Sequence, residues 1–215
     1  MTVIGAEKLK ELIYRTENPG GRLVVTPIID QKEQISDSAA AIDIRLGNKF
    51  IVPQRANVPF IDVKEEDFIT NFQKSAETVY VPYGKPLTLH PRHFVLGNSL
   101  EYFRFPFNIS GYVVSRSSWG RLGLVVATAI GIHPGFFGVL CLELSNSGEV
   151  PISLYPGLTI AQVFFQYVKA EPSDKPAYSA YLGATEVELP QFSPTKEIDK
   201  WGKLVRYKLP RTARR

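Results

Sequence analysis

The stretch SRSSWGRLGLVVATAIGIHPGFFGVLCLELSNSG, from Ser115 to Gly148, contains the features that decide the fold. Short apolar runs rich in valine, isoleucine and phenylalanine alternate here with turn residues such as Pro134-Gly135. The same punctuation recurs further along the chain at Pro156-Gly157. Short apolar runs separated by turn residues are typical of an all-β barrel or sandwich.

A carboxylate interrupts the apolar pattern near the end of this stretch. In VLCLELS, from Val139 to Ser145, three leucines share one face of an expected strand, and Glu143 lies on the other face with Cys141. On an open face, Glu143 would be an ordinary solvated glutamate. On a face covered by its apolar neighbours, partial desolvation would adapt the carboxylate to proton transfer. Spacing alone leaves both interpretations open.

The segment RSSWGR, Arg116–Arg121, offers ligands for phosphate. Guanidinium groups bind phosphate oxygens bidentately, and serine hydroxyls donate hydrogen bonds. Gly120 and Gly123 permit a close backbone approach or an unusual turn. Arginine and serine beside glycine are also common in solvated loops, and the chain has neither a Walker loop nor a dinucleotide fingerprint. The segment therefore indicates a phosphate site only together with its context.

Five segments together resemble, in the same order, the motifs of the dCTP deaminase and dUTPase superfamily, and within it the dCTP deaminase branch. They are SAAAIDIRLGNKFIV (Ser38–Val52), LHPRHFVLGNSLEY (Leu89–Tyr102), RSSWGRLGL (Arg116–Leu124), HPGFFGVLCLELSN (His133–Asn146) and LYPGLTIAQVFF (Leu154–Phe165). Near the start of the chain, GAEKLKELIY has the apolar spacing of a short amphipathic helix like the one that begins this family.

The resemblance implies a mainly β fold: a distorted jelly-roll-like β-barrel of the dUTPase type with a short N-terminal helix. Residues 1–171 would form this domain, and residues 172–215 a C-terminal lid segment and a basic tail. The resemblance also implies a homotrimer with sites between subunits that bind dCTP or dUTP, with dTTP as a candidate inhibitor. Members of the branch deaminate dCTP to dUTP, and some also cleave the triphosphate to give dUMP.

The resemblance also assigns roles by position. Glu143 corresponds to the general acid/base that activates water against the ring carbon bearing the amine. Arg121 matches the arginine that helps to hold this water and the base. Ser117 and Arg121 could also donate hydrogen bonds to the Glu143 carboxylate, and they complete the expected catalytic set. The positions that match the family's nucleotide-binding residues are Arg116, Ser117, Ser118, Trp119, Gly120, Arg121, Ala129, His133, Cys141, Leu142, Gln162 and Tyr178.

Residue counts bear on the metal content of the expected site. Zinc deaminases hold their metal with a histidine or cysteine and two further cysteines. This chain has one cysteine and three scattered histidines, so its sequence excludes that class. Magnesium is expected with the nucleotide triphosphate, bound to phosphate and water more than to protein.

Two positions near the centre of the chain depart from the family pattern. His133 replaces an aspartate expected to contact the sugar hydroxyl, although an imidazole can still hydrogen-bond there. The run VVATA, Val125–Ala129, is shorter than its family counterpart and lacks a histidine usually found there. His133 could take over the position of that missing histidine.

The C-terminal lid candidate, KPAYSAYLGA at Lys175–Ala184, departs further. Tyr178 and Gly183 keep the family spacing, whereas Ala177 and Tyr181 replace an expected lysine and glutamine. A lid role for this segment is therefore the least supported of the assignments.

Length and composition limit the number of domains and the class of protein. A chain of 215 residues with 44% hydrophobic residues can bury one substantial core with an appendage. No stretch approaches the roughly 18 apolar residues of a membrane span, and no signal-peptide pattern is evident. The single cysteine allows no intrachain disulfide. We therefore expect a cytoplasmic protein.

The basic charge is concentrated at the C-terminal end. Residues 196–215 contain eight Lys or Arg and two acidic residues, a net of +6, which leaves −2 for the rest of a chain of net charge +4. Trp201 and Tyr207 lie among these basic residues, a combination that can bind nucleic acid. A solvated tail, or one packed on a neighbouring subunit, has the same composition, so we do not expect nucleic-acid binding.

Three functions remain open from the sequence. The leading one is non-zinc deamination of dCTP through Glu143. The second is a dUTPase or a bifunctional enzyme that yields dUMP and pyrophosphate, which His133 disfavours because hydrolysis would benefit from a carboxylate there. The third is a non-catalytic regulator that binds a pyrimidine nucleotide, suggested by the altered lid and the shortened loop.

Overall fold

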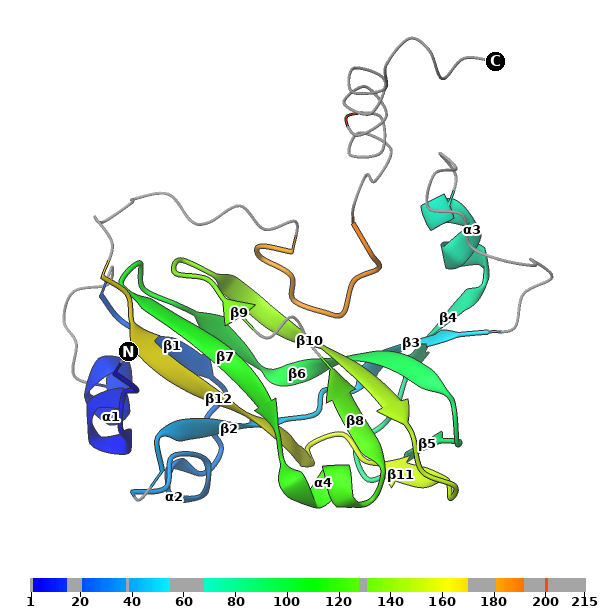
Figure 1. Cartoon of the computed structure of the whole chain (residues 1–215), viewed down its shortest axis with the longest axis horizontal. Helices are drawn as coiled ribbons and strands as arrows, with labels where there is room; N and C mark the ends of the chain where they lie inside the picture. Colours follow the sequence, from blue (N-terminus) through cyan, green and yellow to red (C-terminus); the bar gives the residue numbers. More distant parts are fainter. Residues whose placement is uncertain are drawn as a thin grey trace, which may run out of the picture. The chain divides into compact units, whose positions relative to one another are not determined.

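The structure is a computed structural model of the chain (Figure 1). It describes residues 2–14, 21–37, 39–54, 68–127, 131–169, 181–191 and Lys200. The chain forms two compact units, Met1–Val52 with Thr78–Glu188 and Pro53–Glu77 with Leu189–Arg215. The domain boundary expected at residue 171 stays a prediction.

Most of the chain's regular structure is antiparallel β-sheet. The strands are β1 (Val24–Thr26), β2 (Ala41–Arg45), β3 (Lys49–Pro53), β4 (Ala76–Tyr80), β5 (Leu87–Leu89), β6 (Phe94–Arg104), β7 (Ile109–Ser115), β8 (Leu124–Ala127), β9 (Gly131–Ile132), β10 (Phe137–Asn146), β11 (Ile152–Leu154) and β12 (Thr159–Tyr167). One sheet runs β4-β3-β6-β10-β8, with β1 also paired to β6; a second runs β2-β12-β7-β9; β11 and β5 form a third. The described strands thus form three sheets and do not close into a barrel among themselves.

Strand β10 shows how side-chain alternation produces this fold. Leu142 and Leu144 are fully buried and Leu140 is nearly so, which confirms the leucine face expected from the sequence. Between Val139 and Cys141 the register partner on β6 changes from Tyr102 to Asn98, so the extra residues of this irregularity lie on β6. A bulge of this kind bends the strand that carries the extra residues.

Aromatic side chains join two of the sheets. Phe105, which follows β6, stacks on Phe165 of β12 with ring centroids 5.3 Å apart. Phe103 and Phe165 are fully buried, and burial of such a side chain contributes roughly 1.5–3 kcal/mol. This packing fixes the sheet that contains β10 against the sheet that contains β12, and both sheets contribute residues to the site described below.

Four short helices accompany the sheets. In α1 (Ala6–Tyr14), Leu9 and Leu12 are buried, so the expected amphipathic helix is confirmed. α2 (Gln31–Gln34) precedes β2, α3 (Phe68–Lys74) precedes β4, and α4 (Ser117–Arg121) lies between β7 and β8. The prediction of a mainly β fold with a short N-terminal helix is confirmed. Within the described ranges, no helix has the length and apolarity to cross a membrane.

The second unit is described only in part. Beyond α3, the backbone N–H of Ser75 donates to Phe72 O (3.0 Å) and that of Gln54 donates to Ser75 O (2.6 Å). The Gln54 amide also donates to Glu77 Oε2 (3.1 Å). These bonds tie the end of α3 to the segment that follows β3.

Candidate functional site

The Arg-Ser-Ser segment begins where β7 ends. Arg116 has extended backbone angles, φ −74° and ψ 134°, and the chain then enters the single turn of α4. The Trp119 indole packs against the core, and its Nε1 donates to Thr159 O of β12 at 2.8 Å. This bond ties α4 to β12 and so fixes the orientation of the turn. Trp119 thus has a structural contact, and its expected contact with nucleotide stays a prediction.

A glycine ends the turn by close backbone packing. Gly123 has φ 89°, and a Cβ on this residue would lie 2.7 Å from the backbone N of Gly148. The N–H of Ser147 donates to Gly123 O at 2.8 Å. The positive φ and the short distance from a Cβ to the Gly148 backbone exclude a side chain at position 123. Gly120, by contrast, has open space where a Cβ would lie.

Three polar side chains meet beside this turn, and we call them the outer cluster: Asp43, Arg116 and Gln162. Arg116 Nη1 donates to Asp43 Oδ2 at 2.6 Å, and Gln162 Nε2 donates to Asp43 Oδ1 at 2.7 Å. The Arg116 side chain is 41% exposed and that of Asp43 only 16%. The structure therefore brings two expected nucleotide-binding residues, Arg116 and Gln162, onto one carboxylate.

The sheet register explains this meeting. Gln162 of β12 pairs with Asp43 of β2 on one side and with Val114 of β7 on the other. The sequence interpretation had not assigned a role to Asp43. A signal was available, because this aspartate interrupts the apolar run AAAIDI in the first of the five motifs. Its partners, however, are distant in sequence and only the sheet order identifies them.

Glu143 lies half-buried on β10, which is flanked by β6 and by the edge strand β8 of the six-stranded sheet. Its register partners are Leu96 of β6 and Ala127 of β8. In the part of the chain that the structure describes, no hydrogen bond or ion pair engages its carboxylate. A carboxylate without a partner on a sheet face is free to accept a proton from a bound molecule.

Two expected nucleotide-binding residues precede Glu143 on β10. Cys141 shares the face of Glu143, and desolvation, with a smaller effect of the Glu143 charge, raises the pKa of its thiol to about 12 although part of the residue stays exposed. The thiol is therefore protonated at neutral pH. The Leu142 side chain is fully buried in the core, which leaves only its backbone for contact with a ligand.

The remaining residues of the turn face solvent. Ser117, Ser118 and Arg121 are exposed, and no hydrogen bond joins Ser117 or Arg121 to Glu143 within the chain. The expected convergence of Ser117, Arg121 and Glu143 on one water molecule therefore stays a prediction. Among the described residues, no three His, Cys, Asp or Glu side chains gather in a group that could hold a metal.

His133 begins the turn between β9 and β10. Its carbonyl accepts from the N–H of Phe136 at 3.2 Å, and Gly135 within the turn has φ 76°. The histidine is exposed. Its predicted contact with the sugar stays a prediction, as do those of Ala129 and Tyr178, which lie outside the described residues.

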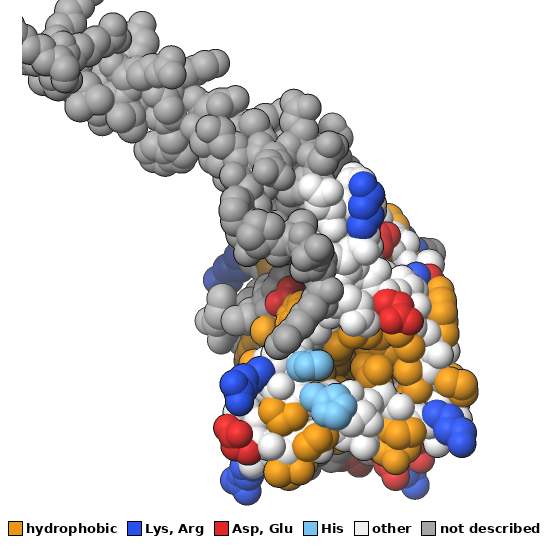
Figure 2. All heavy atoms as spheres, turned by 90° about the vertical axis from the view of Figure 1, so that its right-hand side faces the viewer, with side chains coloured by type: hydrophobic (Ala, Val, Ile, Leu, Met, Phe, Trp, Pro, Cys, Tyr) orange, Lys and Arg blue, Asp and Glu red, His pale blue; other side chains and the backbone are white. Residues whose placement is uncertain are grey.

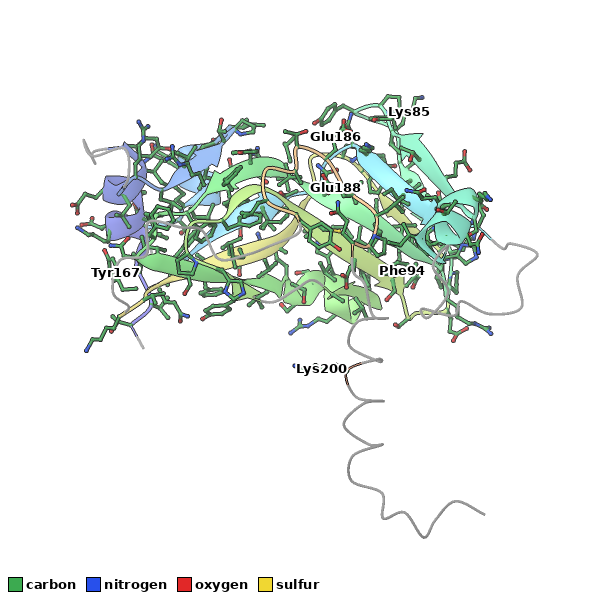
Figure 3. The ribbon with its side chains drawn as sticks, turned by 90° about the horizontal axis from the view of Figure 1, so that it is seen from above. Lys85, Phe94, Tyr167, Glu186, Glu188 and Lys200 are labelled. Atoms are coloured by element: carbon green, nitrogen blue, oxygen red, sulfur yellow. The ribbon has the colours of Figure 1, made fainter. Side chains whose placement is uncertain are left out.

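The end of the lid candidate lies against β10 of the same chain. The N–H of Gly183 donates to Phe137 O, and that of Val139 donates to Ala184 O, both at 2.8 Å. Just beyond, Glu186 pairs with Lys49 of β3 (Figure 3). The C-terminal end of the lid candidate is thus fixed to the β6–β10 sheet.

A second polar group lies beside the outer cluster, and we call it the inner cluster: Arg45, Glu101 and Gln34. Arg45 donates through its backbone N (2.8 Å) and its Nε (2.7 Å) to the two carboxylate oxygens of Glu101. Arg45 Nη2 and Gln34 Oε1 lie 2.7 Å apart, and Gln34 Nε2 donates to Glu101 Oε1 at 3.1 Å. Burial raises the pKa of Glu101, while Arg45 acts in the opposite direction.

Comparisons with known proteins give the same family over most of the chain. Residues 4–168 match the model of a dCTP deaminase-like family. The chain is 40% identical over 159 residues to a dCTP deaminase, dUMP-forming, of Dictyoglomus thermophilum, covering 74% of this chain and 78% of that protein. It is 39% identical over 175 residues to a dCTP deaminase of Haloarcula marismortui, covering 81% and 85%.

A solved structure supports the fold. The crystal structure of 2'-deoxycytidine 5'-triphosphate deaminase from Agrobacterium tumefaciens matches with a TM-score of 0.56 and 21% sequence identity. The match covers 76% of this chain but only 46% of that one, so this chain spans less than half of that structure. At this identity the likeness concerns the fold alone.

Proposed function

The chain belongs to the dCTP deaminase-like family, and on this premise we propose that it hydrolyses dCTP to dUTP and ammonia in pyrimidine deoxynucleotide metabolism. The observation that supports this most directly is Glu143, whose carboxylate lies on a face of the six-stranded sheet and has no hydrogen-bond or ion-pair partner among the described residues. A non-catalytic binding protein has no chemical need for such a group. The deaminase does need one, because water must be deprotonated before it attacks the ring.

Glu143 would act as base and then as acid. It accepts a proton from water, whose oxygen forms a bond to the ring carbon that bears the amine, while the electron pair of the ring C=N bond moves to the adjacent ring nitrogen, which takes up this proton from Glu143. Glu143 then accepts the remaining proton of the new hydroxyl group and passes it to the amine. The bond between the ring carbon and the amine breaks, so that ammonia leaves and a carbonyl remains. Ser117 and Arg121 would hold the water and the base in position.

The Arg-Ser-Ser turn would bind the triphosphate. Arg116 retains guanidinium donors beyond the one used by Asp43, and the exposed Ser117 and Ser118 offer hydroxyls. Magnesium would arrive with the nucleotide as part of the substrate. Remaining contacts would come from the residues expected to line the nucleotide, which are Trp119, Gly120, Ala129, His133, Cys141, the Leu142 backbone, Gln162 and Tyr178.

We also propose a homotrimer whose sites lie between subunits. Phe94 of β6 and Val125 of β8 are the register partners of Ser145 on either side of β10, so they share the sheet face of Glu143. They are 41% and 44% exposed, which is high for large apolar side chains beside an acid/base group. Figure 3 labels Phe94. Hydrophobic side chains also gather on the face shown in Figure 2. A neighbouring subunit would cover such side chains and complete the site, in the cytoplasm where we place the enzyme.

A bifunctional reaction is the second candidate. The relative from Dictyoglomus thermophilum is named dCTP deaminase, dUMP-forming. In such a reaction water would also cleave the triphosphate, giving dUMP and pyrophosphate.

Product analysis tests both proposals. The purified chain is incubated with dCTP and Mg²⁺, and ammonia, pyrophosphate, dUTP and dUMP are measured in one sample. Ammonia with dUTP supports the deaminase, and ammonia with dUMP and pyrophosphate supports the bifunctional enzyme. Absence of ammonia, together with binding of dCTP, would overturn both and favour a nucleotide-binding regulator.

A further inference from the structure

We propose that Asp43 is a positioning residue that holds Arg116 and Gln162 in the geometry required to bind the triphosphate nucleotide. The inference rests on the proposed function and adds a residue that the sequence interpretation did not place in the site. Its basis is the shared carboxylate of the outer cluster, in which each oxygen of Asp43 accepts from a different side chain.

The contacts are suited to orientation. The two distances, 2.6 Å from Arg116 and 2.7 Å from Gln162, are those of short hydrogen bonds to a charged acceptor. The partners come from different elements, because Arg116 follows β7 and Gln162 lies on β12. One carboxylate therefore fixes the relative placement of two long side chains that would otherwise sample many rotamers.

Asp43 is itself held firmly enough to serve this purpose. Its backbone lies in the β2–β12 ladder opposite Gln162. Its carbonyl also accepts from Gln34 Nε2 of the inner cluster at 3.3 Å. The aspartate is thus anchored by a sheet on one side and by a buried polar group on the other.

Both partners keep free capacity for a ligand. A guanidinium has five N–H donors, and Asp43 occupies one of them at Nη1. Gln162 donates one amide hydrogen to Asp43 and retains a second, together with its carbonyl oxygen. Since the Arg116 side chain is 41% exposed, a phosphate can reach the remaining donors. The negative charge of Asp43 weakens the attraction of Arg116 for phosphate, but a fixed donor set binds with a smaller loss of entropy.

Asp43→Asn and Asp43→Ala test the inference in the full-length protein. Asparagine keeps the size but has one acceptor oxygen and places an amide donor against a donor, whereas alanine removes both bonds. The matched control is Asp37→Asn, because Asp37 is exposed and pairs with Lys10 outside the outer cluster. Steady-state kinetics with dCTP are combined with inhibition by inorganic tripolyphosphate, which reports on phosphate binding alone.

Loss of one hydrogen bond to a charged group predicts a rise of about tenfold in the KM for dCTP and in the Ki for tripolyphosphate of Asp43→Asn. We expect kcat to change by less than about threefold, because the proposed role of Asp43 is to hold Arg116 and Gln162 and not to hold Glu143 or its water. A purely structural role would instead lower the melting temperature and the active fraction and leave KM and Ki unchanged. That result, or a variant that behaves like Asp37→Asn, would overturn the inference.

A mutant cycle adds a second criterion. If Asp43 acts through Arg116 and Gln162, adding Asp43→Ala to a variant that carries both Arg116→Ala and Gln162→Ala raises the Ki for tripolyphosphate no further, whereas an independent role gives multiplied effects. Failure of the proposed function has a different signature, because the unaltered chain then releases no ammonia from dCTP. If the unaltered chain also fails to bind dCTP, both proposals fall together; if it binds dCTP without deaminating it, tripolyphosphate binding by the Asp43 variants still tests this inference. A chain that deaminates dCTP while Asp43 variants keep their KM and Ki contradicts this inference alone.

Discussion

The inner and outer clusters contain the same three chemical groups and differ in burial. Each combines an arginine, a carboxylate and a glutamine, and in each the carboxylate accepts from both partners. In the inner cluster the side chains of Arg45 and Glu101 are 11% and 0% exposed. In the outer cluster those of Arg116 and Asp43 are 41% and 16% exposed.

Because of this difference in burial, the same three chemical groups are expected to have different roles in the two clusters. In the inner cluster Arg45 donates to Glu101, to Gln34 and to Pro27 O (3.1 Å), so the donors of its Nε and Nη2 are used within the protein. Buried charges that are hydrogen-bonded within the protein are costly to disturb. In the outer cluster, spare donors face solvent. We therefore expect the inner cluster to govern stability and the outer cluster to govern ligand affinity.

The largest expected effect on stability comes from Glu101→Leu. It removes both acceptor oxygens and leaves the Arg45 charge buried without a counter-ion, and loss of one member of a buried ion pair lowers the free energy of unfolding by about 3–5 kcal/mol. Urea denaturation followed by circular dichroism measures the change. As a control, Arg45→Met combined with Glu101→Leu removes both charges and should recover most of the loss. A change below about 1 kcal/mol for Glu101→Leu would contradict the comparison.

A smaller effect on stability is expected from Asp43→Ala. The ion pair with Arg116 is partly exposed, and pairs of this kind contribute about 0–1 kcal/mol. The same denaturation experiment should therefore show a loss of about 1 kcal/mol or less. A loss as large as that of Glu101→Leu would mean that the outer cluster is also a stability element, and the contrast would fail.

The smallest effect concerns pH. Because burial raises the pKa of Glu101, the folded state binds its proton at a higher pH than the unfolded state does. The contribution of this group to the free energy of unfolding is therefore least favourable at neutral pH. It becomes more favourable as the pH falls through the raised pKa toward the ordinary value of 4.5. The stability difference between wild type and Glu101→Leu should shift toward wild type on acidification, and a pH-independent difference would contradict this.

Local features of the fold were predictable from sequence. The leucine face of β10 and the amphipathic α1 follow from side-chain periodicity, which depends only on neighbours along the chain. The ordered motifs identified the family and the residues of the Arg-Ser-Ser turn. The separation of the strands into three sheets was not predictable in this way, because strand partners are chosen by tertiary packing.

The contacts within the two polar clusters were likewise not predictable from the local sequence. Asp43 and Arg116 are 73 positions apart, and Arg45 and Glu101 are 56 apart. Nothing in the local pattern indicates that the first carboxylate bridges two residues of the expected site. The order β2-β12-β7 was needed to bring them together. Asp43, on a half-buried strand, could have been selected as a polar residue requiring partners, but its partners could not have been named.

The central claim, deamination through Glu143, is tested most directly by ammonia release from dCTP with wild type and Glu143→Gln. Glu149→Gln, at an exposed position just after β10, is the matched control. Loss of a general acid/base predicts a kcat lower by about 10²–10⁴-fold for Glu143→Gln, with dCTP binding retained in calorimetry. Glu149→Gln should match wild type. Full ammonia release by a pure Glu143→Gln preparation would contradict the account.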